Sequence, residues 1–305
     1  MNVAKNEELK FSKICSEWLS YKKPRVKEST YLNYNFNINK HLNRHFKNRD
    51  LKYFTNYDFN KYVEYLQYNL SNKTARDIIT ILKSILKYTE RKYDIDYKLD
   101  LISLPKVNTK EIEIFEEKER KRLEKYIIAS KDIKMNGILI SLYSGLRIGE
   151  ICALKWSDLD FENKLIQVTH TLQRVYVGRR ESKIIYTTPK TKNSVRKIPM
   201  AKILLEKLKD VSTNYSKNAF ILTGKEEKYL EPTAYRYSYS KAIRESKIMY
   251  RKYHCLRHTF ATRCVRIGMD VKSLSEILGH SSVSVTLGIY VHSSYEVKKK
   301  FIDKL

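Results

Sequence analysis

The chain has 305 residues, 42% of them hydrophobic, which is enough to bury a sizeable core in about two domains and excludes a fold that depends on disulfide staples. Lysine and arginine number 60 against 34 aspartates and glutamates, giving a formal net charge of +26 that is spread along the chain. A solvated basic surface is the simpler interpretation, but so large a charge repels itself, and we therefore favour a folded protein that binds DNA or RNA.

The cysteines and the apolar segments bear on the compartment. Cys15, Cys152, Cys255 and Cys264 form no CxxC pair, so we expect reduced thiols. The start of the sequence has no apolar signal segment, and no later stretch approaches the ~20 apolar residues of a membrane span. We expect a cytoplasmic protein without a membrane partner.

The N-terminal part of the sequence has the hydrophobic spacing of helices over residues 11–19, 31–42 and 58–70. The clearest helix follows Asn72, which we expect to be its N-cap. One face of this helix is apolar, at i, i+3, i+4 and i+7 spacing: Ala75, Ile78, Ile79, Leu82, Ile85 and Leu86. The opposite face is cationic and polar: Lys73, Arg76, Thr80, Lys83 and Lys87. Solvent suits such a face, but we favour a DNA groove as its partner.

The helical pattern breaks at Pro105, which indicates an interdomain linker over residues 101–113. We therefore expect a helical N-terminal domain over residues 1–100 and a second domain over residues 114–305.

The second domain mixes helices with short strands. Helical spacing resumes at residues 115–127 and 135–146, with Gly145 as a stop signal. Strand-like runs follow at 165–170, 183–189 and 194–200. Helices return from Ala201, with ends set by Pro232 and Gly268. The predicted fold class is mainly α with a small antiparallel β-sheet.

Candidate catalytic groups occur in four separate segments of this domain. In SGLRIGE, Arg147 follows a glycine turn and Glu150 lies one helical turn later, although a surface ion pair explains that segment alone. In PKTKNSVR, Lys190 lies in a polar turn between two strands, where a solvated lysine is the default interpretation.

The other two segments are HCLRH and LGH…TLGIYVH. His254, Arg257 and His258 share one helical face. Burying two imidazoles and a guanidinium together costs free energy. His280 follows a helix stop, and Tyr290 comes ten positions later.

Zinc is the alternative ligand for these histidines, because His254 and His258 have the spacing of a zinc-binding helix. However, Cys255 stands where a zincin has its catalytic glutamate, and Arg257 places a fixed positive charge beside the site. An irregular site of Cys255, His258 and Cys264 is a weaker version of the same idea. We expect no metal and no cofactor, since arginine and histidine without acidic ligands suit an anion.

Together the four segments resemble the tyrosine recombinase, or phage integrase, family, with all six expected positions filled in the family's order. The resemblance implies that Tyr290 is the nucleophile, that Arg147 and Arg257 clamp the phosphate, and that Lys190 is the general acid. It makes His254 and His280 the remaining active-site pair, and Glu150 and His258 supporting residues. Tyr295 is the nearest competing tyrosine, but it lacks the TLGIYVH context.

The resemblance also implies an architecture. The N-terminal domain is expected to be a core-binding, SAM-like domain that forms a C-shaped clamp on DNA with the mixed α+β catalytic domain. The amphipathic tail ending in VKKKFIDKL is expected to pack as a helix on a neighbouring protomer, giving a homotetramer on paired double-stranded recombination sites. Accessory DNA-bending or directionality proteins fit this setting. We expect no separate domain before the core-binding helices, a departure from the larger integrases of the family that puts arm-site binding in doubt.

The implied reaction is strand exchange of a mobile element through a 3′-phosphotyrosyl intermediate, without ATP or metal. Integration, excision, dimer resolution and inversion use one active site, so the residues do not select among them, nor do they give the recognition sequence. A type IB topoisomerase and a non-catalytic DNA-binding regulator stay open as alternatives. A zinc hydrolase fits least well.

Overall fold

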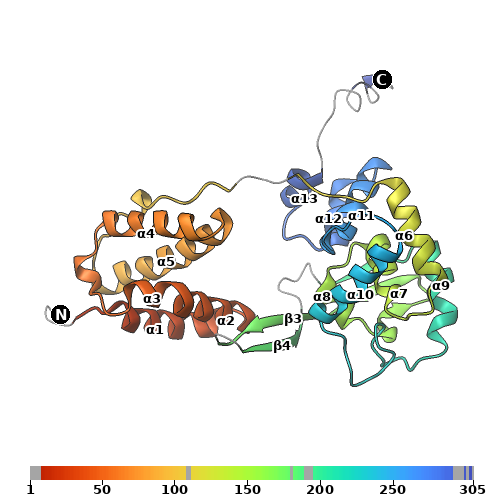
Figure 1. Ribbon diagram of the computed structural model, residues 1–305, viewed down its shortest axis with the longest axis horizontal. Helices are drawn as coiled ribbons and strands as arrows, with labels where there is room; N and C mark the ends of the chain where they lie inside the picture. Colours follow the sequence, from red (N-terminus) through yellow and green to blue (C-terminus); the bar gives the residue numbers. More distant parts are fainter. Residues whose placement is uncertain are drawn as a thin grey trace. The chain divides into compact units, whose positions relative to one another are not determined.

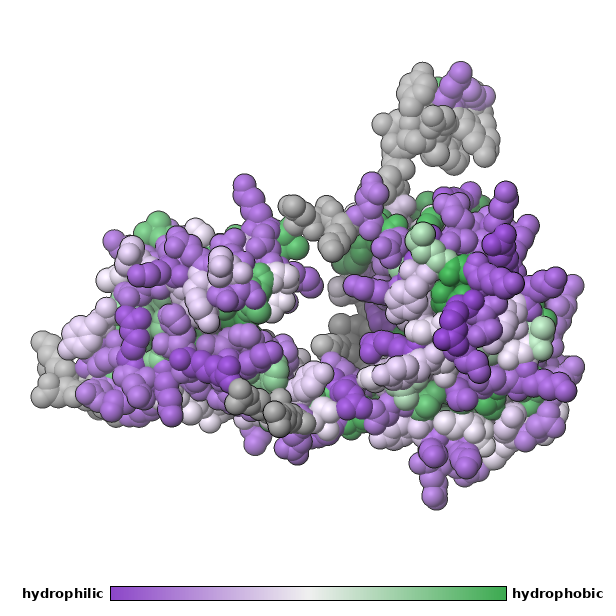
Figure 2. Space-filling model, viewed as in Figure 1, coloured by the Kyte–Doolittle hydropathy of each residue, from purple (hydrophilic) through white to green (hydrophobic). Residues whose placement is uncertain are grey.

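The structure, a computed structural model, describes residues 8–107, 111–178, 181–188 and 195–290, together with residues 299, 302 and 303. The chain divides into two compact units (Figure 1). The N-terminal unit comprises residues 1–110 and 175–183, and the C-terminal unit comprises residues 111–174 and 184–305. Hydrophilic residues cover most of the visible face of each unit (Figure 2), as the charge of the chain requires.

The N-terminal unit is helical. Its α-helices are α1 (Phe11–Lys22), α2 (Glu28–Asn37), α3 (Asn43–Phe46), α4 (Asn56–Asn69) and α5 (Asn72–Tyr93). Shorter 3-10 turns are η1 (Lys23–Arg25), η3 (Leu51–Tyr53) and η4 (Leu99–Leu101), and a π-helical segment, η2 (Ile38–Leu42), joins α2 to α3. The predicted apolar stripes of α1 and α5 are buried together in one core.

Helix α5 begins as expected in position but not in its cap. The N-cap is Ser71, whose hydroxyl accepts the Thr74 N–H at 3.3 Å, so the prediction of Asn72 as N-cap was wrong by one residue. Asn72 instead donates its side-chain amide to the Lys106 carbonyl at 2.9 Å. A serine hydroxyl reaches the orphan N–H groups of the first turn as well as an asparagine does, and sequence alone does not choose between neighbours.

The polar face of α5 is partly occupied by the chain itself. Arg76 donates to the Pro105 carbonyl at 3.1 Å, and Lys83 donates to the Ile102 carbonyl at 3.2 Å. The segment after α5 therefore lies along this face, and two of the four cations that we assigned to DNA also hold protein backbone. DNA contact by this face stays a prediction.

Among the residues described, the C-terminal unit has eight α-helices, one 3-10 turn and a small sheet, and a second small sheet has residues in both units. The helices are α6 (Glu117–Ala129), α7 (Met135–Ser144), α8 (Ile148–Ala153), α9 (Lys202–Ser212), α10 (Pro232–Glu245), α11 (His254–Arg266), α12 (Val271–Leu278) and α13 (Val283–Tyr290), with a 3-10 turn η5 (Trp156–Asp158). The strands are β1 (Leu159–Asp160), β2 (Leu165–Val168), β3 (Thr171–Tyr176), β4 (Ser182–Thr187) and β5 (Arg196–Pro199).

Strands β1, β2 and β5 form an antiparallel sheet in that order, with Ile166 opposite Ile198. Strands β3 and β4 form a separate two-stranded sheet. The predicted fold class, mainly helical with small antiparallel sheet, is confirmed. Strand β3 was missed, because its sequence TLQRVY directly follows LIQVTH and reads as a continuation of the turn.

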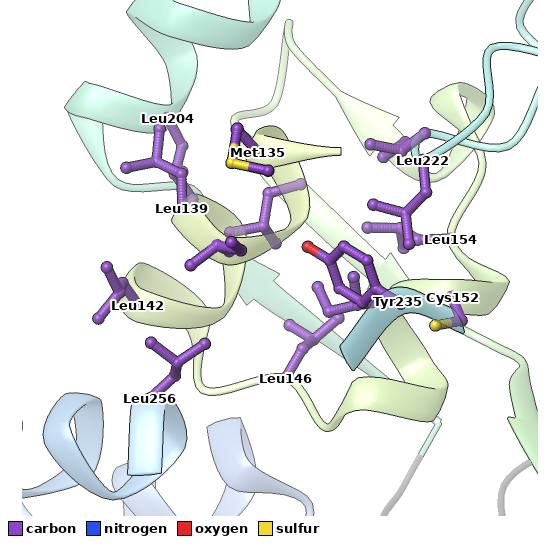
Figure 3. Close-up of a cluster of buried hydrophobic side chains, with 14 of the residues drawn as sticks. Met135, Leu139, Leu142, Leu146, Cys152, Leu154, Leu204, Leu222, Tyr235 and Leu256 are labelled. Atoms are coloured by element: carbon purple, nitrogen blue, oxygen red, sulfur yellow. The ribbon is translucent and has the colours of Figure 1, made fainter. Parts of the chain in front are cut away.

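Helix α7 is the centre of this unit and is buried along nearly its whole length. Figure 3 shows its leucines, Leu139 and Leu142, packed among side chains from other elements, including Leu204 of α9 and Leu256 of α11. Each such leucine contributes about 1.5–3 kcal/mol through burial. The end of α7, and the turn that follows it, are therefore held firmly in place.

In the described ranges, no helix is both long and apolar enough to cross a bilayer.

Candidate active site

Arg147 lies in a tight turn between α7 and α8. Gly145 ends α7 with a φ of +67°, and its N–H donates to the Ser141 carbonyl at 3.0 Å. A Cβ at this glycine would lie 2.7 Å from the Phe260 ring and 2.8 Å from the Leu278 side chain, so the turn needs glycine. Arg147 follows two residues later as the N-cap of α8.

Glu150 connects Arg147 to a second arginine. Its carboxylate accepts the Arg147 backbone N–H at 2.8 Å and Arg147 Nη1 at 2.9 Å. It also accepts both terminal nitrogens of Arg196, at 3.1 and 3.0 Å. Burial alone raises the pKa of Glu150, but Arg196 and Arg147 outweigh burial and hold that pKa below its ordinary range. The carboxylate is therefore ionised, and it orients two guanidiniums at once.

Arg257 is the buried cation of the site, with 2% of its surface exposed. It lies on α11, and its Nη1 donates to the Gly145 carbonyl at 2.9 Å, which ties it to the turn that carries Arg147. Its Nη2 is buried and has no hydrogen-bond partner among the described residues. Burial, with Arg147 nearby, lowers the pKa of Arg257 to about 9, so the group is still charged at neutral pH.

The first turns of α11 also place His258 beside Tyr290 and His254 beside His258. His258 Nδ1 and the Tyr290 hydroxyl are 2.7 Å apart, within hydrogen-bonding distance. The rings of His254 and His258 meet edge to face, with centroids 4.5 Å apart. Burial, then His258 and Arg257, lowers the pKa of His254 to about 4, and burial with Arg257 lowers that of His258. Both imidazoles are therefore neutral at pH 7.

Tyr290 is the last residue of α13 and is 7% exposed. Burial raises the pKa of its phenol, and Arg257 opposes that shift. His280 follows Gly279 at the end of α12, and its ring lies parallel to the Tyr290 ring with centroids 6.5 Å apart. His280 Nδ1 is 2.7 Å from the Thr286 hydroxyl, and burial with Arg257 lowers the pKa of His280 to about 4.

The structure brings together most of the predicted site. Turns and helix ends converge so that one cluster contains five of the six candidate catalytic residues, Arg147, His254, Arg257, His280 and Tyr290, together with both supporting residues, Glu150 and His258. Lys190 and Tyr295 lie outside the described residues. The chemical roles of all these side chains stay predictions.

Arg196 is the site residue that the sequence analysis missed. It begins β5, where it shares a face with Ile198, which is buried, and buried Met200 follows the strand. An arginine on a buried strand face needs an acidic partner. The alternation of Arg196 with apolar residues along the strand was the signal in the sequence that Arg196 is buried. It did not identify Glu150 as its acidic partner.

The charge of the site suits an anion. The site holds three guanidiniums, of which Arg147 and Arg196 bond the carboxylate of Glu150 and Arg257 does not, and the nearby histidines are neutral. In the described parts of the chain, no group of three histidine, cysteine or acidic side chains is arranged to hold a metal ion. All four cysteines are described, buried and free. Paired guanidinium donors match the geometry of phosphate oxygens.

Comparison with known proteins gives a consistent result. A family model described as the phage integrase family matches residues 113–297, and one described as the N-terminal SAM-like domain of phage integrases matches residues 10–67. The chain is 30% identical over 274 residues to a tyrosine recombinase XerC-like protein of Caldanaerobacter subterraneus subsp. tengcongensis, covering 80% of this chain and 68% of that protein.

Two mobile-element proteins are also similar. The transposase from transposon Tn916 of Enterococcus faecalis is 31% identical over 238 residues, or 68% of this chain, and this match spans about half of the transposase, 54%. Among solved structures, the Tn1549 transposon integrase in complex with transposon right end DNA has a TM-score of 0.78 at 25% identity, covering 96% of this chain and 99% of that one.

Proposed function

The chain belongs to the phage integrase family of tyrosine recombinases, which are DNA strand transferases, and we propose that it recombines a mobile element at specific DNA sites by using Tyr290 as nucleophile. The observation that carries this proposal is the buried phenol of Tyr290, 2.7 Å from His258 Nδ1 and in the field of Arg257. Arg257 opposes the rise in the Tyr290 pKa that burial causes, and so favours the phenolate that attacks phosphorus.

The first step is attack of the Tyr290 oxygen on the scissile phosphorus. A phenol with an ordinary pKa of ~10 is a weak nucleophile, and burial here raises its pKa further, so it needs a proton acceptor. Neutral His258 is within reach of that proton. Arg147 and Arg257 bind the non-bridging oxygens, whose charge grows in the pentacoordinate transition state. The buried, unpartnered Nη2 of Arg257 is a donor of the kind this step requires.

The second half of the step is departure of the 5′ oxygen, which takes a proton from Lys190 in the proposed mechanism. The products are a 3′-phosphotyrosyl link and a free 5′ hydroxyl. Because the link keeps the energy of the broken phosphodiester, a 5′ hydroxyl from another strand reverses the step without ATP. His254 and His280 complete the donor set around the phosphate.

The partners follow from the same proposal. Duplex DNA carrying paired recombination sites is the substrate, in keeping with the DNA-bound Tn1549 transposon integrase. We expect a homotetramer with exchange of C-terminal tails and a C-shaped clamp on the DNA, both implied by the family resemblance. Accessory DNA-bending or directionality proteins and a cytoplasmic location belong to the same set of expectations. Similarity to the Tn916 transposase supports integration and excision of a mobile element as the setting.

A nicked suicide substrate tests the proposal. DNA flanking the gene, nicked so that the short fragment bearing the new 5′ hydroxyl diffuses away, is incubated with the protein and run on a denaturing gel. The wild-type chain is expected to form a covalent adduct, Tyr290→Phe to bind without forming one, and the matched variant Tyr295→Phe to behave as wild type. An adduct retained by Tyr290→Phe contradicts the assignment. Relaxation of any supercoiled plasmid without site preference points to a topoisomerase instead.

A further inference from the structure

We propose that Arg196, which lies outside the predicted catalytic set, is a positioning residue that keeps Arg147 available for the phosphate by occupying Glu150. The inference rests on the proposed function. Its basis is a single buried guanidinium with three described acceptors. Arg196 Nη1 and Nη2 donate to the two oxygens of Glu150 at 3.1 and 3.0 Å, and Nε donates to the Ile277 carbonyl at 2.6 Å.

The first function of Arg196 is to divide the Glu150 carboxylate between two cations. The side chains of Glu150 and Arg196 are only 3% and 6% exposed, so removing Arg196 would leave a buried charge on Glu150 without its main partner. The side chain of Arg147 is 38% exposed. Arg147 Nη1 donates a hydrogen bond to Glu150. Arg147 Nη2 donates a longer one, of 3.3 Å, to the Gly279 carbonyl. Without Arg196, the buried carboxylate would lose its main counter-charge and would draw both terminal nitrogens of Arg147. A bidentate pair of that kind takes Arg147 away from the phosphate.

The second function is to fix the turn that carries His280. The guanidinium of Arg196 packs against Gly279, where an added Cβ would lie 3.1 Å from Nη1. Gly279 has a φ of +64°, and its carbonyl accepts Arg147 Nη2. The bond from Arg196 to the Ile277 carbonyl holds the other side of this turn. One side chain thus sets the position of both Arg147 and His280 without itself reaching the reacting atoms.

The role predicts a separation between binding and chemistry. Misplacing a reacting group by about 1 Å costs on the order of 100-fold in rate, while most DNA affinity comes from phosphate contacts elsewhere. We therefore expect Arg196→Met to slow single-turnover adduct formation by about 10- to 100-fold. The Kd for the same DNA fragment is expected to change by less than about twofold, since Arg196 makes no base or outer phosphate contact in this account. Arg196→Lys keeps the charge but lacks the paired donors, and it is expected to fall in between.

A double-mutant cycle with Glu150→Gln distinguishes this role from a general structural one. If Arg196 acts mainly through the charge of Glu150, Arg196→Met costs clearly less in the Glu150→Gln background than in the wild-type chain, because the carboxylate that competes for Arg147 is already gone and only the support of the Gly279 turn is lost. Multiplicative defects, or an unchanged rate in Arg196→Met, overturn the inference. Lys202→Met, which removes an exposed cation on α9 that pairs with Glu206, is the matched control and is expected to keep the wild-type rate.

The same gel keeps the two proposals apart. Absence of an adduct with the wild-type chain, or an adduct with Tyr290→Phe, refutes the proposed function. A wild-type adduct that forms equally fast with Arg196→Met and Arg196→Lys refutes only the positioning role. Urea unfolding of each variant checks its fold, and if Arg196→Met does not fold, Arg196→Lys and the cycle built on it decide the question.

Discussion

At the scale of single residues, Arg257 is the side chain whose burial most needs an anion. One of its terminal nitrogens bonds to the Gly145 carbonyl, and the other is buried without a partner among the described residues. Leaving such a donor unsatisfied costs about 1–3 kcal/mol. A fold that accepts this cost in its core, next to a tyrosine and two histidines, has a donor ready for a ligand oxygen.

We expect Arg257→Lys to reduce single-turnover cleavage by about 100- to 1,000-fold, the range seen when one transition-state donor is removed. The ammonium keeps the positive charge, but it cannot bond the Gly145 carbonyl and a phosphate oxygen along two fixed directions. Quenched-flow measurement of adduct formation gives the rate, and Arg266→Lys, at an exposed position near the end of the same helix, is the control. Equal rates for the two variants would remove Arg257 from the clamp.

The histidines of the site make the fold sensitive to acid. The pKa values of half-buried His280 and of His254, the more exposed of the two, are lowered to about 4, by desolvation first and then by neighbouring charged groups, from ~6.5 in an unfolded chain. Between these limits the unfolded state binds more protons than the folded state, so stability falls as the pH decreases from ~6.5 towards ~4. Above ~6.5 both groups are neutral in either state and have no effect.

Urea unfolding at about pH 7 and about pH 5 is therefore expected to show a lower free energy of unfolding at the acidic pH. The double variant His254→Asn/His280→Asn removes both titrating groups and is expected to show a smaller difference between the two conditions. A difference as large as that of the wild-type chain would mean that other groups cause the acid sensitivity.

At the scale of elements, the turns determine the site more than the helices do. Gly145 and Gly279 both have positive φ, and each contributes a carbonyl that accepts an arginine of the cluster. Glycine stops are readable from sequence, which is why the positions of Arg147 and His280 at chain turns were predicted. The arginines that bond these two turns are more than 100 residues away in the chain. Such tertiary contacts cannot be predicted from local sequence patterns.

The turn at Gly145 gives a direct test of this view. Gly145→Ala adds steric overlap with Phe260 and Leu278, worth about 1–3 kcal/mol, to the cost of a left-handed backbone, about 1–3 kcal/mol more. Gly268→Ala is the matched control, because Gly268 also has positive φ but a Cβ there meets nothing within 4 Å. Urea unfolding is expected to show a clearly larger loss for Gly145→Ala. Equal losses would show that the close packing of this turn does not matter.

Other elements show which local patterns can be read from the sequence and which cannot. The amphipathic face of α5 was predicted correctly, since a 3.6-residue period over a long helix leaves little ambiguity. Strand β3 and the π-helical segment Ile38–Leu42 were missed, because a short strand after another strand and a widened helical turn have no distinct local pattern. Arg196 was missed for a different reason: its acceptors, Glu150 and Ile277, are far away in the chain.

At the scale of the whole molecule, the net charge of +26 is the property that bears on DNA affinity. Neutralising phosphates releases counterions, so we expect affinity for a DNA fragment to fall roughly 1,000-fold or more between about 50 and 200 mM salt. A filter-binding titration measures the slope. If the cationic face of α5 contacts DNA, Lys73→Met and Lys87→Met each make the dependence of log affinity on log salt concentration less steep, while Lys202→Met leaves it unchanged. Equal slopes for the three variants would mean that this face of α5 does not contact DNA.

Identification of the tyrosine that becomes linked to DNA is the most direct measurement. The chain is incubated with a nicked substrate in EDTA, digested with protease and nuclease, and the nucleotide-bearing peptide is sequenced by mass spectrometry. The expected result is one modified peptide, with the nucleotide on Tyr290 of TLGIYVH, formed in full without added metal. Modification of Tyr295 or another tyrosine, or an adduct that appears only when magnesium or zinc is restored, would contradict the account.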